Sequence, residues 1–248
     1  MRGVTHQIRR LLVKIIGLLL ISMFGITGGS THGALADNWG NPMHFEFIPK
    51  RPWLSGDKSA ILGDGDIVSN TAAVLEQFLI QNRIPPNTEI HLNSRGGDVS
   101  AGLKMGRLIR AHHLHTWVGM YDQRAHRSVR QMLESTVNIG YCISSCTLAF
   151  LGGVERQIDY ADGIYAVHQV TMECVNPNLP EADQHTEVST CLTVTSAMIG
   201  VQEILGEVIE YVNEMGVDPR FVEQMTKADP KDMNSLSIWF LREYKITK

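Results

Sequence analysis

The segment Cys142-Ile143-Ser144-Ser145-Cys146 contains the residues of this 248-residue chain that are best suited to covalent chemistry. A serine becomes a nucleophile when a nearby base can take its proton and hydrogen-bond donors can hold the oxyanion that forms. Ser144 follows an apolar run and precedes the helical sequence 147–151, which predicts a turn from a strand into a helix. Such a turn exposes the hydroxyl and directs the following backbone N–H toward the same place. We therefore predict that Ser144 is a nucleophile.

Two other features could supply the remaining parts of such a site. Gly96-Gly97 forms a second turn from a strand into a helix, where backbone amides can approach a substrate carbonyl because no Cβ intervenes. His168 ends a predicted strand, from which its imidazole could reach Ser144. Each feature alone has an ordinary structural explanation, as a helix cap, a tight turn or a polar strand end. Only their combination indicates catalysis.

These residues need a scaffold, and from about residue 59 strands and helices alternate along the chain. This alternation predicts an α/β protein with a mainly parallel sheet and right-handed crossovers. The apolar patterns predict strands at 59–62, 89–93, 116–120 and 164–167, and helices at 71–81, 99–111, 194–212, 219–227 and 237–244. The polar stretch 121–136 is predicted to be an insert with a short helix, and 169–192 a long loop.

The order and spacing of these features resemble the Clp protease proteolytic subunit and the wider ClpP/crotonase superfamily, over roughly residues 59–246. Asn93-Ser94-Arg95-Gly96-Gly97-Asp98-Val99 is similar to the family's N-S-P-G-G turn. The segment 142–153 is similar to its A-A-S-M-G serine segment, and Tyr165-Ala166-Val167-His168-Gln169 to its strand ending in His-Gln. The resemblance implies repeated ββα units with a mainly parallel sheet flanked by helices, in a domain spanning 59–248.

The resemblance also implies a role for individual residues. The family has a glycine nine residues after the nucleophile. Gly153 stands at that distance from Ser144, whereas Val154 stands at that distance from Ser145, so the register selects Ser144. His168 falls on the catalytic histidine, and the backbone amides of Gly97 and Ser145 fall on the oxyanion donors.

The third member of the triad matches less well. Asp232 is the candidate, but it lies one residue further from Leu236-Ser237 than the family spacing requires, and Asp229 is the reserve. The sequence leaves open whether either carboxylate completes the triad. Arg95 in place of the family's proline and Cys146 in place of a glycine are further departures. The insert at about 121–136 lengthens the step from Gly97 to Ser144, so substrate preference and assembly do not transfer from the cytosolic enzyme.

The first 36 residues have the pattern of a secretory signal peptide. Basic residues precede a short apolar run at 15–26, and Ala34-Leu35-Ala36 is a small-x-small cleavage signature. An uncleaved anchor is the alternative, but the run is shorter than the ~20 residues that a spanning helix needs. We predict a signal peptide at 1–36, an N-terminal extension at 37–58, and no stable membrane span after cleavage.

Charge and cysteine content fit an exported protein. Without the four basic leader residues, 18 basic residues remain against 26 acidic ones, a net charge of −8, which argues against nucleic acid as a partner. All four cysteines follow the leader, and an oxidising compartment favours disulfides. Four cysteines allow three pairings, which the sequence cannot distinguish; we favour Cys142 with Cys146 and Cys174 with Cys191. Cys142 or Cys146 as a thiol nucleophile is the alternative.

We expect neither a metal nor another cofactor. The C-x3-C spacing suits zinc poorly, and the histidines at 112, 113 and 115 span a helix end and a strand start, where they diverge. The leading hypothesis is a periplasmic or secreted serine hydrolase, a peptidase that acts on peptides or unfolded proteins and assembles as a homo-oligomer. The alternatives are a non-peptidase acyl hydrolase of the same fold and an inactive binding or scaffold protein.

Overall fold

The computed structural model describes residues 40–48, 50, 58–119, 140–170, 194–229 and 231–247. The chain divides into two compact units, Met1–Ala36 and Asp37–Lys248, and all of the described residues belong to the second. The predicted signal peptide, the insert at 121–136 and nearly all of the 169–192 loop lie outside the described residues. No helix among the described residues is long and apolar enough to cross a membrane.

Five strands form the first sheet, in the order β1-β2-β3-β4-β6. They are β1 (His44–Ile48), β2 (Ala60–Asp64), β3 (Glu89–Asn93), β4 (His115–Val118) and β6 (Arg156–Ile158). The four strands from β2 to β6 run parallel, and β1 is antiparallel to β2. Every residue of β2 is buried, as expected of a parallel strand that is covered on both faces.

The second sheet is small and carries the predicted serine and histidine at its strand ends. It has the order β5-β7-β8, with β5 (Gly140–Ile143) parallel to β7 (Gly163–Val167) and β8 (Asn234–Ser235) antiparallel to β7. The two sheets meet where β3 ends. There the Ser94 amide donates to the Tyr141 carbonyl at 2.7 Å, and the Ile143 amide donates to the Ser94 carbonyl at 3.0 Å. The glycine turn after β3 is thereby fixed beside β5.

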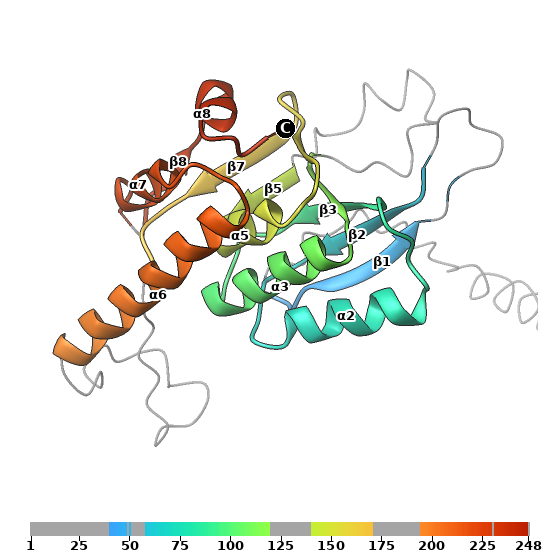
Figure 1. Cartoon of the computed structure of the whole chain (residues 1–248), viewed down its shortest axis with the longest axis horizontal. Helices are drawn as coiled ribbons and strands as arrows, with labels where there is room; N and C mark the ends of the chain where they lie inside the picture. The colour runs from blue at the N-terminus through green and yellow to red at the C-terminus, as the bar shows by residue number, and fades with distance from the viewer. Residues whose placement is uncertain are drawn as a thin grey trace, which may run out of the picture. The chain divides into compact units, whose positions relative to one another are not determined.

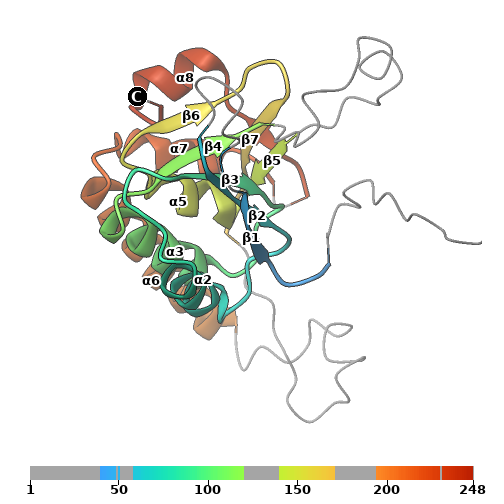
Figure 2. The same ribbon diagram turned by 90° about the vertical axis from the view of Figure 1, so that its right-hand side faces the viewer.

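Helices cover the sheets, and one of them, α3, begins at a side-chain cap. They are α2 (Thr71–Gln81), α3 (Val99–Ala111), α5 (Ser145–Leu151), α6 (Val194–Glu214), α7 (Arg220–Thr226) and α8 (Ile238–Glu243). Figures 1 and 2 show α2 and α3 side by side along one face of the first sheet. Asp98 caps α3 by accepting the Ala101 amide at 2.7 Å, and α5 packs against α3 in the core.

The predicted fold class is confirmed, because the protein is α/β with a mostly parallel sheet flanked by helices. The structure adds three strands to the sequence prediction. β1 lies within the predicted N-terminal extension at 37–58 and pairs with β2, whose own residues are all buried while those of β1 are not. β6 and β8 have three and two residues, too few for a hydrophobic period to reveal them.

Candidate active site

Ser144 occupies the sharp turn between β5 and α5, where its backbone is strained. Its φ of 56° and ψ of −128° lie in a region that residues with a Cβ rarely adopt. β5 ends at Ile143 and α5 begins at Ser145, so the turn is a single residue long. This conformation at a strand-to-helix turn holds a serine hydroxyl away from the sheet, as nucleophile elbows do.

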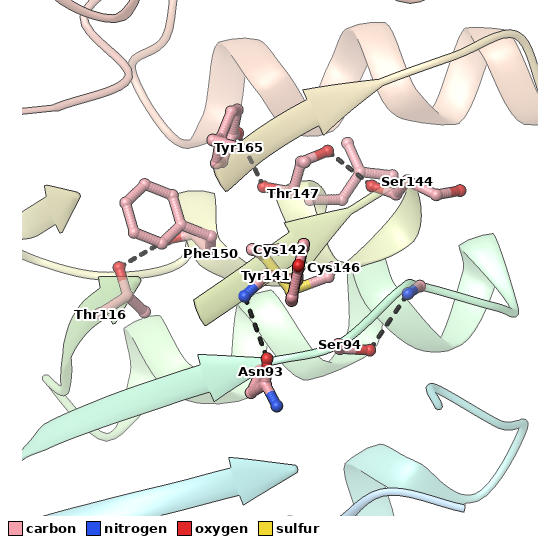
Figure 3. Close-up of a disulfide and its surroundings, with 12 residues drawn as sticks. Asn93, Ser94, Thr116, Tyr141, Cys142, Ser144, Cys146, Thr147, Phe150 and Tyr165 are labelled. Carbon is pink, nitrogen blue, oxygen red and sulfur yellow. Dashed lines mark hydrogen bonds between the residues drawn. A yellow bond between two sulfur atoms is a disulfide. The ribbon is translucent and has the colours of Figure 1, made fainter. Parts of the chain in front are cut away.

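Three hydrogen bonds, which involve Ala166, Thr147 and Tyr165, hold this turn, and Figure 3 shows two of them. The Ser144 amide donates to the Ala166 carbonyl of β7 at 3.0 Å. The Thr147 hydroxyl donates to the Ser144 carbonyl at 2.6 Å, and the Tyr165 hydroxyl donates to the Thr147 carbonyl at 3.1 Å. Burial raises the pKa of Tyr165, which keeps this hydroxyl protonated as a donor. Thr147 and Tyr165 both lie within the motifs described above, but their residue types alone do not predict that they hold the turn.

A disulfide joins Cys142 to Cys146 on either side of Ser144, as the sequence analysis favoured (Figure 3). Both cysteines are fully buried, and their Cα atoms lie 5.2 Å apart. The bond ties the end of β5 to the first turn of α5, and in this state neither sulfur is a free thiol nucleophile. Cys174 and Cys191 lie outside the described residues, so their pairing stays a prediction.

The glycine turn after β3 lies directly against the serine. Gly96 and Gly97 have φ values of 100° and 131°, which favour glycine. A Cβ built on Gly96 would lie 2.7 Å from the Ser144 Cβ and 2.9 Å from the Ser145 amide nitrogen. A Cβ on Gly97 would collide with the Ile67 carbonyl oxygen. Glycine at position 96 allows the backbone this close to the serine, and glycine at position 97 allows it to pack against Ile67.

The amides of Gly97 and Ser145 are available as donors. Among the described residues, neither N–H has a hydrogen-bond partner, and Ser145 is the first residue of α5, where amides have no intrahelical acceptor. The Ser94 hydroxyl accepts the Gly96 amide at 3.1 Å and fixes the turn that presents Gly97 (Figure 3). Both amides belong to the two turns that pack together at Ser144, and free donors of this kind can hold an oxyanion.

His168 follows β7 immediately and is half-buried. Ile143 pairs with Ala166 in the β5–β7 ladder, so Ser144 and His168 leave neighbouring strands at the same edge. His168 Nδ1 lies 2.7 Å from the Gln169 carbonyl oxygen. Because a carbonyl oxygen can only accept, this contact places a ring hydrogen on Nδ1, and in the neutral imidazole Nε2 then has the lone pair. No hydrogen bond joins Nε2 to Ser144 among the described residues; such bonds often tighten only when substrate binds.

Among the described residues, no carboxylate forms a hydrogen bond or an ion pair with His168. Asp232 and Asp229 are exposed, and the Asp229 carboxylate accepts the Lys231 amide at 2.9 Å. Within the described part of the chain, neither aspartate forms a hydrogen bond or an ion pair with His168. The described residues also contain no group of three or more His, Cys, Asp or Glu side chains that could hold a metal ion.

Comparison with known proteins gives a likeness in structure only. No family model matches the chain, and no curated protein matches it. One similar solved structure is that of a point mutant of ClpP1 from Listeria monocytogenes, with 14% sequence identity, 75% of this chain and 86% of that chain covered, and a TM-score of 0.45. Identity this low says nothing about activity. Membership of the ClpP/crotonase superfamily therefore stays a prediction from motifs, and any assignment of function depends on the geometry of the site.

Proposed function

We propose that this protein is a serine hydrolase in which Ser144 is the nucleophile and His168 is the general base and acid. The observation that carries the proposal is the strained backbone of Ser144, with the Gly96-Gly97 turn packed against it. Strain of this kind costs about 1–3 kcal/mol and persists where function requires it. A serine that only capped α5 would need no such conformation, and Ser144 makes no side-chain cap hydrogen bond.

The chemistry follows from the position of each group. His168 Nε2 takes the proton as Ser144 Oγ attacks the acyl carbon. The amides of Gly97 and Ser145 donate to the oxyanion of the tetrahedral intermediate. His168 then gives the proton to the leaving group, and water releases the acyl group from Ser144 by the same steps in reverse order. No cofactor is needed for this reaction.

The proposed substrates are peptides or unfolded proteins, and the proposed location is the periplasm or the exterior of the cell. Support for a peptidase comes from the serine, glycine and histidine motifs taken together. Support for export comes from the pattern of the first 36 residues and from the disulfide beside Ser144, since disulfides persist in oxidising compartments. Assembly as a homo-oligomer is proposed from the same motif resemblance.

Labelling with a fluorophosphonate tests the proposal. The wild-type protein should form a covalent adduct at a measurable rate, and Ser144→Ala should form none. Ser237→Ala is the matched control, because Ser237 is exposed and makes no side-chain cap hydrogen bond, and it should label like wild type. Undiminished labelling of Ser144→Ala would overturn the assignment.

An inactive binding or scaffold protein is the second candidate. The observation in its favour is the lack of any carboxylate contact to His168 among the described residues. It predicts no adduct in the wild-type protein. Faster turnover of an acyl thioester than of any peptide would instead indicate a non-peptidase acyl hydrolase.

A further inference from the structure

The β7–β8 ladder determines which residue faces His168. Ala166 pairs with Ser235 and Val167 pairs with Asn234 in this antiparallel ladder. The ladder ends at the Val167–Asn234 pair, and one further step in the same register would place Met233 opposite His168. Directly opposed residues in an antiparallel pair place their side chains on the same face, with Cβ atoms about 5 Å apart. In this inferred register, the position opposite the imidazole belongs to a methionine, which is 50% exposed.

Neither aspartate takes that position. Asp232 lies in a bend before β8, which begins at Asn234, and among the described residues it makes no hydrogen bond or ion pair with His168. The chain at Asp229 turns instead, because Asp229 accepts the amides of Lys231 and Asp232 with its carboxylate and its carbonyl.

Gln169 supplies the contact that an acid would otherwise make. Its carbonyl oxygen accepts the hydrogen on His168 Nδ1 at 2.7 Å. Gln169 is held at two points by the end of α7: its amide donates to the Ala228 carbonyl at 3.1 Å, and its side-chain Nε2 donates to the Thr226 carbonyl at 2.8 Å. The carbonyl that orients the imidazole is thus fixed by contacts outside its own strand.

We propose that the main chain of Gln169, and not Asp229 or Asp232, positions His168, so that the protein works as a Ser144–His168 dyad with Gln169 as its positioning residue. This inference rests on the proposed function. A carbonyl fixes the same tautomer that an aspartate would fix, but it has no full negative charge to stabilise the imidazolium that forms during attack. Catalysis should therefore be slower than with an acid, and it should improve when a carboxylate is placed opposite His168.

Fluorophosphonate labelling rates of single variants test which group acts on His168. D229N and D232N should each label within about threefold of wild type, whereas loss of a triad aspartate lowers the rate by about 10⁴. A fall of more than about a hundredfold in either variant would overturn the inference. M233D should label at least about tenfold faster than the uncharged M233N, and the acidic limb of its pH–rate profile should move to higher pH. Equal rates for M233D and M233N would contradict the inferred register.

The anchor on α7 is tested by Q169E, whose carboxylate cannot donate to the Thr226 carbonyl. This variant should label at least about tenfold more slowly than wild type. Its thermal unfolding should stay close to that of wild type, because Gln169 is exposed. Labelling as fast as wild type would contradict the positioning role.

Nitrogen-15 NMR of histidine gives a readout that does not need turnover. In Ser144→Ala, the His168 ring should carry its hydrogen on Nδ1, with the signal assigned by its loss on H168Q. Adding Q169E should change the tautomer populations, and adding D232N should not; the opposite pattern would overturn the inference. Absence of any adduct in the wild-type protein would refute the proposed function, whereas labelling that depends on Asp229 or Asp232 would refute this inference alone.

Discussion

At the scale of single residues, two features of this protein carry a cost in free energy: the strained backbone of Ser144 and the buried side chain of His91. Ser144 holds an unfavourable φ, and hydrogen bonds to Ala166 and from Thr147 maintain it. His91 is a second case, away from the serine. Its ring lies 4.3 Å from that of Trp117 between centroids, and its side chain is almost fully buried. Burial lowers the pKa of His91 below its ordinary value of 6.5, against the opposing effect of Glu89 at 3.5 Å.

His91 should make the stability of the protein depend on pH. The unfolded chain binds a proton on this histidine near pH 6.5, and the folded chain binds it only at lower pH, so stability should fall as the pH drops below 6.5. His91→Phe keeps a ring against Trp117 and should reduce this dependence. Urea unfolding at about pH 7.5 and about pH 5.5 measures it.

Glu89 acts in a separate range of pH. The hydrogen bond from His91, with help from Lys58, holds the pKa of Glu89 at about 2, so its contribution is lost only as the pH falls from 4.5 toward 2. An equal loss of stability in wild type and His91→Phe between the two test conditions would contradict the role given to His91.

Ser144 and His168 can be proposed from the sequence because their motifs are local, whereas the acid cannot be chosen in this way. The nine-residue step to Gly153 distinguishes Ser144 from Ser145. Whether Asp232 faces His168 depends on the pairing of β7 with β8, which are joined by more than sixty residues of chain. A one-residue difference in that register exchanges a carboxylate for Met233. Pairing between distant strands is the information that the sequence does not carry.

At the scale of elements, the disulfide joins β5 to α5 across the strained turn. Cross-linking so short a loop should stabilise the protein by about 2 kcal/mol in the chain-entropy model. Cys142→Ala/Cys146→Ala should therefore lower the free energy of urea unfolding by at least about that amount, and Ser144 should label more slowly. As a control, the urea unfolding of the variant is measured with and without dithiothreitol, because the difference gives the contribution of any other disulfide to stability. Unchanged stability and labelling would contradict the role of the bond as a clamp.

Gly106 in α3 allows α3, α5 and α6 to pack closely against one another. A Cβ on Gly106 would collide with the Tyr211 hydroxyl, which donates to the Leu148 carbonyl of α5 at 2.8 Å. Gly106→Ala should lower stability by about 1–3 kcal/mol despite the better helix propensity of alanine. Gly206 in α6 is the matched control: a Cβ there meets nothing within 4 Å, so Gly206→Ala should raise stability by about 0.5–1 kcal/mol. Thermal unfolding of the two variants measures the difference, and equal effects would contradict tight packing at Gly106.

Helices and strands are predictable from the sequence where apolar residues recur at a regular spacing and a residue type that favours a helix start precedes them. The predicted helices at 71–81 and 99–111 match α2 and α3 residue for residue, and the predicted strand at 89–93 matches β3. The sequence prediction lacks β1 because this strand follows a leader-like stretch. Among the described strands, β1 pairs only with β2. Strands of two or three residues, such as β8 and β6, are defined by their partners rather than by their own sequence.

At the scale of the whole molecule, Arg156 connects parts of the chain that are far apart in sequence. Its guanidinium is fully buried and donates to five carbonyl oxygens, which belong to Leu151, Gly153, Met215, Lys245 and Ile246. These carbonyls follow α5, α6 and α8, so one side chain holds the ends of three helices. Burial lowers the pKa of Arg156 to about 10, which leaves it charged at neutral pH.

Loss of this arginine should destabilise the entire fold. Arg156→Met keeps an unbranched stem but removes the donor to the Met215, Lys245 and Ile246 carbonyls, whereas Leu151 and Gly153 still accept from Arg110. The free energy of unfolding should therefore fall by at least about 3 kcal/mol. Arg220→Met is the control, because Arg220 is exposed and pairs with Asp218 at the surface, and its loss should be much smaller. Urea unfolding followed by circular dichroism measures both; similar losses would contradict the structural role of Arg156.

The central claim is that this fold presents Ser144 as a nucleophile, and the most direct test locates the bond that it forms. The protein is treated with a fluorophosphonate, digested, and analysed by tandem mass spectrometry. We predict a single adduct on the peptide that contains Ser144, with the modification on that residue and none on Ser145. An adduct on another residue, or no adduct in correctly folded protein, would contradict the claim.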